Sequence, residues 1–306
     1  MDYCNDSKSH RKVLVIGDIM LDQYVIGKAR RLCPEDPEPV LEAVETRCFP
    51  GGAANVAVNI KNMGGQVILA GLIGKDEEGD LLRKLLNQKN IPALLGVDAG
   101  RPTTVKKRIG TSEQLFVRLD REREGGIPKG IFHDILKVVA VILEDVGVVI
   151  ISDYGKGVVT RELIAAVSVT CKARNIPIYV NPIGSDFSRY RQTDVLKPSF
   201  HTMEILYGSE IRKAGDLEKA AEVVFAVTNC KACIVTWGSN GVILFRSPGD
   251  WIHYPCQKTW DTVYDPGTED VFLAGLAMAA IKGLSLEAAC MEFHVTASAA
   301  APITPC

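Results

Sequence analysis

The chain has 306 residues, of which 47% are hydrophobic and 24% are charged, an ordinary composition for a globular protein. Its formal net charge of -2 gives no electrostatic reason to expect a nucleic acid or an anionic membrane as partner. No apolar run reaches the roughly 18 residues of a membrane span, and the polar start of the chain lacks the apolar core of a signal peptide. We therefore expect a cytoplasmic protein with one large α/β domain over residues 1–306.

The nine cysteines are scattered along the chain, and an odd, scattered set is typical of reduced thiols rather than of a disulfide framework. Cys230 and Cys233 form one CxxC pair. A zinc site would need a second pair or histidines at matching spacing. We interpret the pair as a loop that enters a strand, and we expect no metal-ligating residues.

Short apolar runs alternate with helical patterns from the start of the chain onward. The first run, Lys12–Gly17, is followed by Asp18 and has the profile of a buried parallel strand. Further strands are expected at Gln66–Ala70, Val146–Ser152, Ile176–Asn181, Ala232–Thr236 and Val242–Phe245. Helices are expected between many of them, at Ala54–Met63, Glu77–Asn90, Arg161–Asn175 and Asp216–Thr228. This order predicts βαβ units in a doubly wound α/β sheet.

Two stretches interrupt this order. Leu21–Cys48 and Thr103–Asp120 carry strand-like alternation, as in Phe116–Asp120, without intervening helices. We expect them to form a small β-sheet that projects from the main sheet as a lid. We also expect this lid to make the contact of a homodimer.

Ligands in such folds bind beyond the carboxyl ends of the strands. Asp18 and Asp22 follow the first strand, and carboxylates accept strong hydrogen bonds from sugar hydroxyls. The alternative is that one of them only caps a turn. Gly51, Gly52 and Asn55 open the next helix, where glycine lets the backbone approach a ligand, although such a pair is often just a turn.

Two further groups of candidate residues contain basic side chains. Asp153 and Lys156 lie on one glycine-containing loop after a strand, which suits a polyanionic ligand. Lys106, Arg108 and Arg118 lie in the second lid segment. They suit a substrate phosphate, and the alternative is a solvated basic edge.

The last candidate lies before the apolar helix Val271–Lys282. Gly267 and Asp270 stand at its start, where free backbone N–H groups can bind an anion and a carboxylate can act as general base. The alternative is a simple helix cap, because Asp is common in the first helical turn.

Taken together, these segments resemble the ribokinase (PfkB) family, from about residue 12 to the C-terminus. In detail they are most similar to the kinases that phosphorylate C1 of a heptose 7-phosphate on the way to ADP-heptose. The segments that carry the resemblance are GDIMLDQY, RLCPEDPEPV, PGGAANVAVNI, PTTVKKR, QLFVRLD, ISDYGKG, NPIGSDFSRYR and VYDPGTED.

The resemblance implies a Rossmann-like domain with a β-sheet lid that often makes a dimer. It also implies transfer of the γ-phosphate of ATP, with Mg2+, to a sugar hydroxyl of a small sugar phosphate. Asp270 would be the base, and Gly267 with the helix N-terminus would stabilise the phosphoryl charge. The implied substrate residues are Asp18, Asp22, Gly51, Gly52, Asn55, Lys106, Arg108, Asp153 and Lys156. The implied nucleotide residues are Thr236, Gly238, Gly241, Thr268 and His294.

The nucleotide side departs from the family pattern. Glu269 replaces the glycine of a Gly-Ala-Gly-Asp motif, and Asn181 and Ile183 replace an acid and a base. Ser199–Thr202 and His294 stand where the family has an Asn-x-x-Glu motif and an asparagine. An unopposed carboxylate about 4 Å from the phosphoryl group would cost on the order of 4 kcal/mol at an effective dielectric of 20.

Three functions therefore remain open. The first is an active sugar-phosphate kinase, and the second is a catalytically impaired relative that binds a sugar phosphate or a partner protein. The third is a kinase of the same fold for another small substrate, such as a different sugar or a nucleoside.

Overall fold

A computed structural model describes residues 11–36, 38–123, 125–256 and 267–296, with only the backbone described for Ser239 and for residues 294–296. Its main sheet has nine strands in the order β13-β12-β11-β10-β9-β8-β1-β4-β5. Neighbouring strands are parallel except where β12 pairs with β11 and β13. The strands are β1 (Lys12–Gly17), β4 (Val67–Gly74), β5 (Ala93–Asp98), β8 (Val146–Ser152), β9 (Ile178–Asn181), β10 (Val195–Leu196), β11 (Ala232–Thr236), β12 (Val242–Ser247) and β13 (Asp250–Tyr254).

Strand β1 explains why the sequence reads as a continuous apolar run. Val13 and Val15 pack into the core on one face of the sheet, and Leu14 and Ile16 pack into the core on the other face. A parallel strand that is buried on both faces needs apolar residues at every position. Helices cover both faces, as predicted for a doubly wound sheet.

The helices on the two faces of the main sheet pack into two separate core clusters. Side chains from α1, α2, α7 and α8 belong to one core cluster, and side chains from α3, α4, α5 and α6 belong to the other. The helices are α1 (Ala53–Asn62), α2 (Glu77–Gln88), α3 (Lys129–Ile142), α4 (Arg161–Ala173), α5 (Phe200–Tyr207), α6 (Ala214–Thr228), α7 (Thr268–Ile281) and α8 (Leu286–Thr296). In the part of the chain that the structure describes, no helix is both long and apolar enough to cross a membrane.

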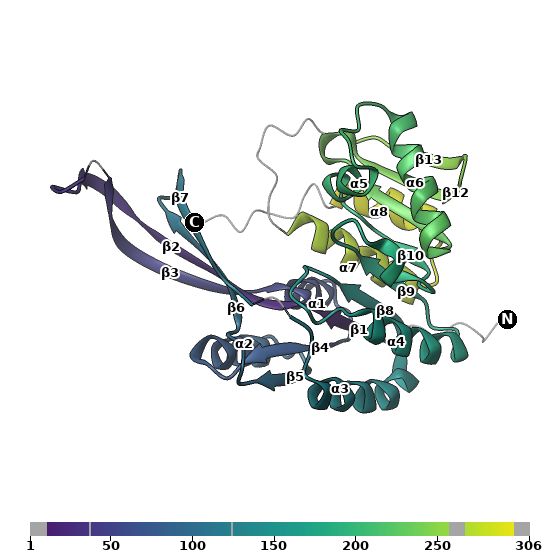
Figure 1. The fold of residues 1–306 in the computed structure, drawn as a ribbon, viewed down its shortest axis with the longest axis horizontal. Coiled ribbons are helices and arrows are strands. Elements are labelled where there is room, and N and C mark those ends of the chain that lie inside the picture. Colours follow the sequence, from purple (N-terminus) through teal and green to yellow (C-terminus); the bar gives the residue numbers. More distant parts are fainter. Residues whose placement is uncertain (1–10, 37, 124, 257–266, 297–306) are drawn as a thin grey trace.

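The second sheet, which we call the lid sheet, has four strands in the order β3-β2-β6-β7. They are β2 (Ile19–Leu32), β3 (Pro39–Gly52), β6 (Thr104–Gly110) and β7 (Leu115–Arg121). The strands β2 and β3 pair from Ile19 opposite Gly52 to Leu32 opposite Pro39, and they project from the main sheet as a long ribbon (Figure 1). The predicted second sheet is therefore confirmed in both of its segments.

Some elements were not expected from the sequence. The edge strands β5 and β13, the short strand β10 and the helices α3, α5 and α8 were not identified, and β9 begins two residues later than expected. Strand β1 lies between β8 and β4, so the strand order reverses around it. This reversal is the place where a doubly wound sheet opens a crevice at its carboxyl ends.

Candidate active site

A cavity of about 270 Å³ lies between the lid sheet and the N-terminus of α7. Residues from the lid sheet, from the loop after β8 and from the starts of α1 and α7 surround it. Its lining residues are Met20, Asp22, Tyr24, Phe49, Pro50, Gly52, Asn55, Lys106, Arg108, Arg118, Tyr154, Gly267, Glu269 and Asp270. Of the candidates from the sequence, it therefore brings together Asp22, Gly52, Asn55, Lys106, Arg108, Arg118, Gly267 and Asp270.

The lid sheet supplies a cationic wall of this cavity. Lys106 and Arg108 alternate along β6 and therefore share one face of the sheet, and Arg118 lies opposite Arg108 on β7. Arg108 Nη1 donates a hydrogen bond to Asp22 Oδ1 over 2.8 Å. Arg118 forms two hydrogen bonds to Asp120, of 2.9 and 2.7 Å. The strand register thus explains why these separate motifs converge.

Lys106 is the cation of this wall that is most available to a ligand. Among the residues that the structure describes it forms no ion pair, and its ammonium lies 5.4 Å from the ring centre of Tyr154. Burial lowers the pKa of Lys106, and the negative charge of Asp22 opposes this shift. An arriving phosphate would give this buried ammonium a partner.

Asp270 lies in the first turn of α7 on the opposite side of the cavity and is only 5% exposed. Asn55 Nδ2 donates to its Oδ2 over 2.8 Å, and the Tyr154 hydroxyl donates to its Oδ1 over 2.6 Å. Burial raises the pKa of Asp270, while these two donors and the positive charge of Lys197 oppose the rise. A buried carboxylate with a raised pKa is suited to take a proton from a bound hydroxyl.

Two glycines bring the starts of α1 and α7 to the cavity. Gly52 has φ 59°, and a Cβ there would lie 2.4 Å from the Asp18 carbonyl oxygen. Gly267 has φ 121°, and a Cβ there would lie 3.2 Å from Asn55 Nδ2. These positions therefore require glycine both for backbone conformation and for space.

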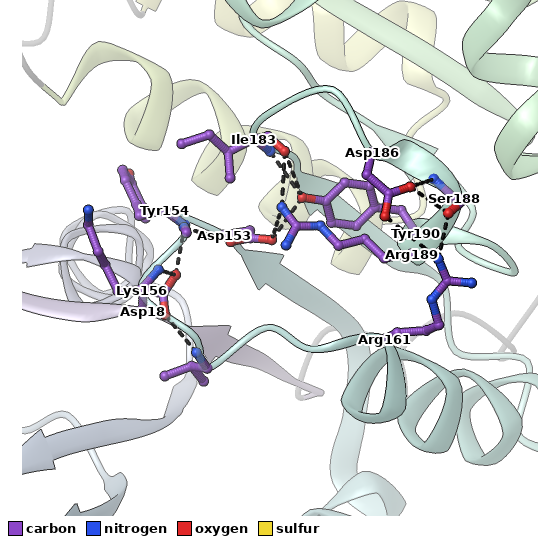
Figure 2. Close-up of polar contacts among 12 residues, drawn as sticks. Asp18, Asp153, Tyr154, Lys156, Arg161, Ile183, Asp186, Ser188, Arg189 and Tyr190 are labelled. Atoms are coloured by element: carbon purple, nitrogen blue, oxygen red, sulfur yellow. Dashed lines mark hydrogen bonds and ion pairs between the residues drawn. The ribbon is translucent and has the colours of Figure 1, made fainter. Parts of the chain in front are cut away.

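The carboxylate of Asp18 is engaged by the loop after β8, and its contact with a sugar stays a prediction. Its carboxylate is 1% exposed and accepts hydrogen bonds from the backbone N–H groups of Tyr154, Lys156 and Val158, over 2.8, 3.0 and 3.0 Å (Figure 2). Asp18 does not line the cavity. It anchors the loop after β8, and this loop carries Tyr154 to Asp270.

Asp153 and Lys156 also lie outside the lining of the cavity. Asp153 points toward Tyr190 and Arg189, with Oδ2 accepting from the Tyr190 hydroxyl over 2.8 Å and lying 3.1 Å from Arg189 Nη2 (Figure 2). Burial raises the pKa of Asp153 to about 6. Lys156 Nζ pairs with Glu122 over 2.7 Å. Gly51 packs beside the cavity, because a Cβ there would lie 2.1 Å from Asp22 Oδ2.

The predicted nucleotide residues lie at the neighbouring end of the sheet. Thr236 ends β11, and Gly238 and Gly241 lie in the turn to β12 with φ 50° and 94°. Thr268 is the first residue of α7. His294 belongs to α8, but its side chain lies outside the described residues.

Glu269 has partners that the sequence did not reveal. Its carboxylate accepts the hydroxyl of Thr236, with oxygen distances of 2.6 and 2.8 Å, and forms an ion pair with Lys197. Burial lowers the pKa of Lys197 to about 7, and the negative charge of Asp270 opposes this shift. A buried ammonium therefore faces the carboxylate of Glu269, so in this structure that carboxylate is not unopposed.

Sequence reasoning missed Lys197 and Tyr154 as site residues. Lys197 directly follows the buried strand β10, and a lysine at the end of an apolar run was the available signal. Tyr154 lies inside the loop that gave Asp153 and Lys156, but nothing in its spacing connects it with Asp270. Its contact depends on the tertiary fold.

The residues at this site do not form a ready cation site. Among the described residues, no three His, Cys, Asp or Glu side chains gather as metal ligands. The two carboxylates beside the N-terminus of α7, Glu269 and Asp270, already have the partners described above. Cys230 and Cys233 are buried free thiols whose pKa values are raised by burial.

Comparison with known proteins points in one direction. A family described as pfkB family carbohydrate kinase matches residues 10–302. The bifunctional protein HldE of Trichlorobacter lovleyi is 34% identical over 292 residues, which cover 94% of this chain and 59% of that protein. HldE of Shewanella sediminis is 36% identical over 282 residues, covering 91% of this chain and 57% of that protein. The chain thus spans less than three fifths of the length of these relatives.

A solved structure agrees on the fold. The tetrameric inhibited form of phosphofructokinase-2 from Escherichia coli superposes with a TM-score of 0.76, covering 95% of this chain and 93% of that one. The two chains are 20% identical, so this likeness concerns the fold alone.

Proposed function

The chain belongs to the pfkB family of carbohydrate kinases, and on this premise we propose that it transfers the γ-phosphate of ATP to a hydroxyl of a sugar phosphate. One observation carries the proposal. The cavity has a buried carboxylate, Asp270, on one side and the cations Lys106, Arg108 and Arg118 on the other. A sugar phosphate can place a hydroxyl against Asp270 and its phosphate against the three cations.

The reaction uses these groups in a defined order. The sugar's own phosphate binds Lys106, Arg108 and Arg118 through charge-assisted hydrogen bonds. Asp270 accepts the proton of the attacking hydroxyl while the new O–P bond forms and the bond from the γ-phosphorus to the β,γ-bridging oxygen breaks, leaving ADP. The N–H groups at the start of α7 face the phosphoryl group and stabilise its charge.

Magnesium ordinarily accompanies ATP in such transfers, held largely by phosphate oxygens and water. Because Glu269 and Asp270 already have protein partners, we assign this chain no dedicated residue for the ion and no step that depends on it.

The proposed acceptor is C1 of a heptose 7-phosphate, in a route to ADP-heptose. Support comes from the motif resemblance and from identities of 34% and 36% with two HldE proteins. A sugar that carries its phosphate far from the reacting carbon also suits a cavity whose base and cations face each other.

Phosphoryl transfer is tested with heptose 7-phosphate and ATP by 31P NMR, with fructose 6-phosphate and a nucleoside as competing acceptors. The expected result is a new sugar 1-phosphate signal that is lost in Asp270→Asn. Asp216→Asn, a change at a half-buried position in the first turn of α6 and outside the lining of the cavity, is the matched control. Transfer by Asp270→Asn at the parent rate would remove Asp270 as the base.

The second candidate is a sugar-phosphate-binding relative without turnover. The ion pair between Glu269 and Lys197 favours it, because this pair occupies donor groups beside the start of α7. Binding of heptose 7-phosphate by calorimetry, with no transfer by the parent, would select this candidate.

We further propose that the lid sheet forms a homodimer contact. Val117 and Leu119 alternate along β7 and are 47% and 52% exposed, so they give one face of the lid sheet an exposed apolar pair. Sedimentation equilibrium at micromolar concentration tests this, and a monomer throughout would oppose it.

A further inference from the structure

A lysine beside the candidate active site is wholly buried. Lys197 follows β10, its side chain is 0% exposed, and its ammonium contacts the Glu269 carboxylate. The same ammonium lies 3.5 Å from the Glu269 carbonyl oxygen. Lysine is almost never fully buried unless it is paired, because an unpaired buried charge is strongly unfavourable. The carboxylate of Glu269 beside Lys197 therefore offsets the cost of burying this ammonium.

The anion that the structure provides is the side chain of Glu269. Besides Lys197 it takes hydrogen bonds from the Thr236 hydroxyl, at 2.6 Å to Oε1 and 2.8 Å to Oε2. Glu269 also lines the cavity and is 19% exposed, so the carboxylate is reachable from the space that Asp270 faces. One carboxylate thus uses both the buried cation and the hydroxyl at the ends of β10 and β11.

Those two donors suit a phosphate as well as a carboxylate. An ammonium, a hydroxyl and the N-terminus of a helix, here α7, are the usual components of phosphate sites. Lys197, Thr236 and Gly267 come from three separate elements whose ends meet beside Asp270. The arrangement is therefore a phosphate site in which a side chain of the protein is the present ligand.

We propose that Glu269 is an internal competitor for the subsite of Lys197 and Thr236, which it occupies until the terminal phosphate of a nucleoside triphosphate displaces it. The inference rests on the proposed function, since it identifies where the phosphoryl donor of that reaction binds. It also gives the substitution at Glu269 a physical effect on donor affinity.

The competition has a measurable size. A ligand that binds only the minor, open arrangement has its affinity reduced by the fraction of molecules in that arrangement. Minor states of this kind are commonly populated at about 0.1–10%. Removing the charge of Glu269 should therefore tighten binding of the triphosphate by roughly 10-fold or more, because Lys197 would then lack its anionic partner.

The test is calorimetric titration with adenylyl imidodiphosphate, an ATP analogue that is not turned over, and separately with ADP. Glu269→Gln keeps the size of the side chain and removes its charge. We expect it to tighten binding of the triphosphate analogue at least 10-fold and binding of ADP much less, because ADP lacks the terminal phosphate. Glu210→Gln removes an exposed glutamate paired with Arg212 and is the control, which should change neither affinity.

Two further variants test the subsite residues themselves. In the Glu269→Gln background, Thr236→Val and Lys197→Met should each reverse the gain in affinity for the triphosphate analogue. Unchanged affinity in Glu269→Gln, an equal gain for ADP, or a gain that survives both second changes would overturn the proposal. Titration with heptose 7-phosphate is run in parallel. If that sugar does not bind while Glu269→Gln still tightens the triphosphate, the subsite stands and the proposed acceptor fails.

Discussion

Replacing Tyr154 by phenylalanine should raise the pKa of the proposed base. The Tyr154 hydroxyl donates to Asp270 Oδ1 over 2.6 Å, and Asn55 donates to Oδ2 over 2.8 Å. A hydrogen bond to a charged group contributes about 1.5–3 kcal/mol, and one pKa unit corresponds to about 1.4 kcal/mol. Losing one of the two donors should therefore destabilise the ionised form of Asp270 by about 1.5–3 kcal/mol and raise its pKa further.

The sign of the effect on the reaction follows from the role of Asp270. A general base works in its ionised form, so a higher pKa moves the acidic limb of the kcat/KM profile to higher pH. Tyr154→Phe should lose activity at the acidic end of the profile and recover most of it at the alkaline end. The KM for the sugar phosphate should change little, because the phosphate is held by the lid sheet. The assay is phosphoryl transfer from pH 5 to 9, with carboxyl NMR titration of Asp270 as a second readout.

A matched control is available in the same neighbourhood. The Tyr190 hydroxyl donates to Asp153 over 2.8 Å, outside the cavity lining. Tyr190→Phe removes an equivalent hydrogen bond but should leave the acidic limb in place. The Tyr154 hydroxyl is assigned to orient Asp270 and to stabilise its ionised form. This assignment would be refuted by an acidic limb that does not move in Tyr154→Phe, or by an equal shift in both variants.

Two other predictions concern binding and stability. Lys106→Met should weaken binding of the sugar phosphate by about 1–3 kcal/mol and leave binding of the unphosphorylated sugar unchanged, which calorimetry checks; equal losses for both would place the phosphate elsewhere. Burial raises the pKa of Asp153 from 3.8 to about 6, so the folded protein binds this proton more tightly than the unfolded chain does. Its stabilising contribution is complete below about pH 4 and is lost as the pH rises through about 6. The unfolding free energy should therefore fall by up to about 3 kcal/mol between pH 4 and 6, and Asp153→Asn should remove this fall. Urea titrations across this range measure it, and the same pH dependence in parent and variant would contradict the prediction.

Secondary structure could be predicted from the sequence where burial imposes a regular pattern of apolar residues. Continuous apolar runs such as Lys12–Gly17 predicted strands buried on both faces, and both faces are covered. Alternation without helices predicted the lid sheet, because a sheet with one face in solvent needs polar residues on that face. The edge strand β5 was missed, since Ala93–Asp98 is only partly buried and contains a glycine.

The directions of the side chains at the site could not be predicted from the sequence. Asp18 and Asp22 are four residues apart, yet Asp18 points under the loop after β8 and Asp22 points into the cavity. Hydrogen bonds between residues more than 130 positions apart decide that difference, and no local pattern contains them. Lys197 and Glu269 are 72 positions apart, so their pairing had no local signal either.

The anchoring of the loop after β8 by Asp18 connects the base side of the cavity to the interior of the main sheet. Three backbone N–H groups of this loop donate to the Asp18 carboxylate, which directly follows β1. The same loop places the Tyr154 hydroxyl against Asp270. The cations Lys106, Arg108 and Arg118 belong to a separate sheet that β2 joins to β1 through one residue, Asp18. A ligand that contacts both Asp270 and these cations must accordingly bridge the main domain and the lid sheet.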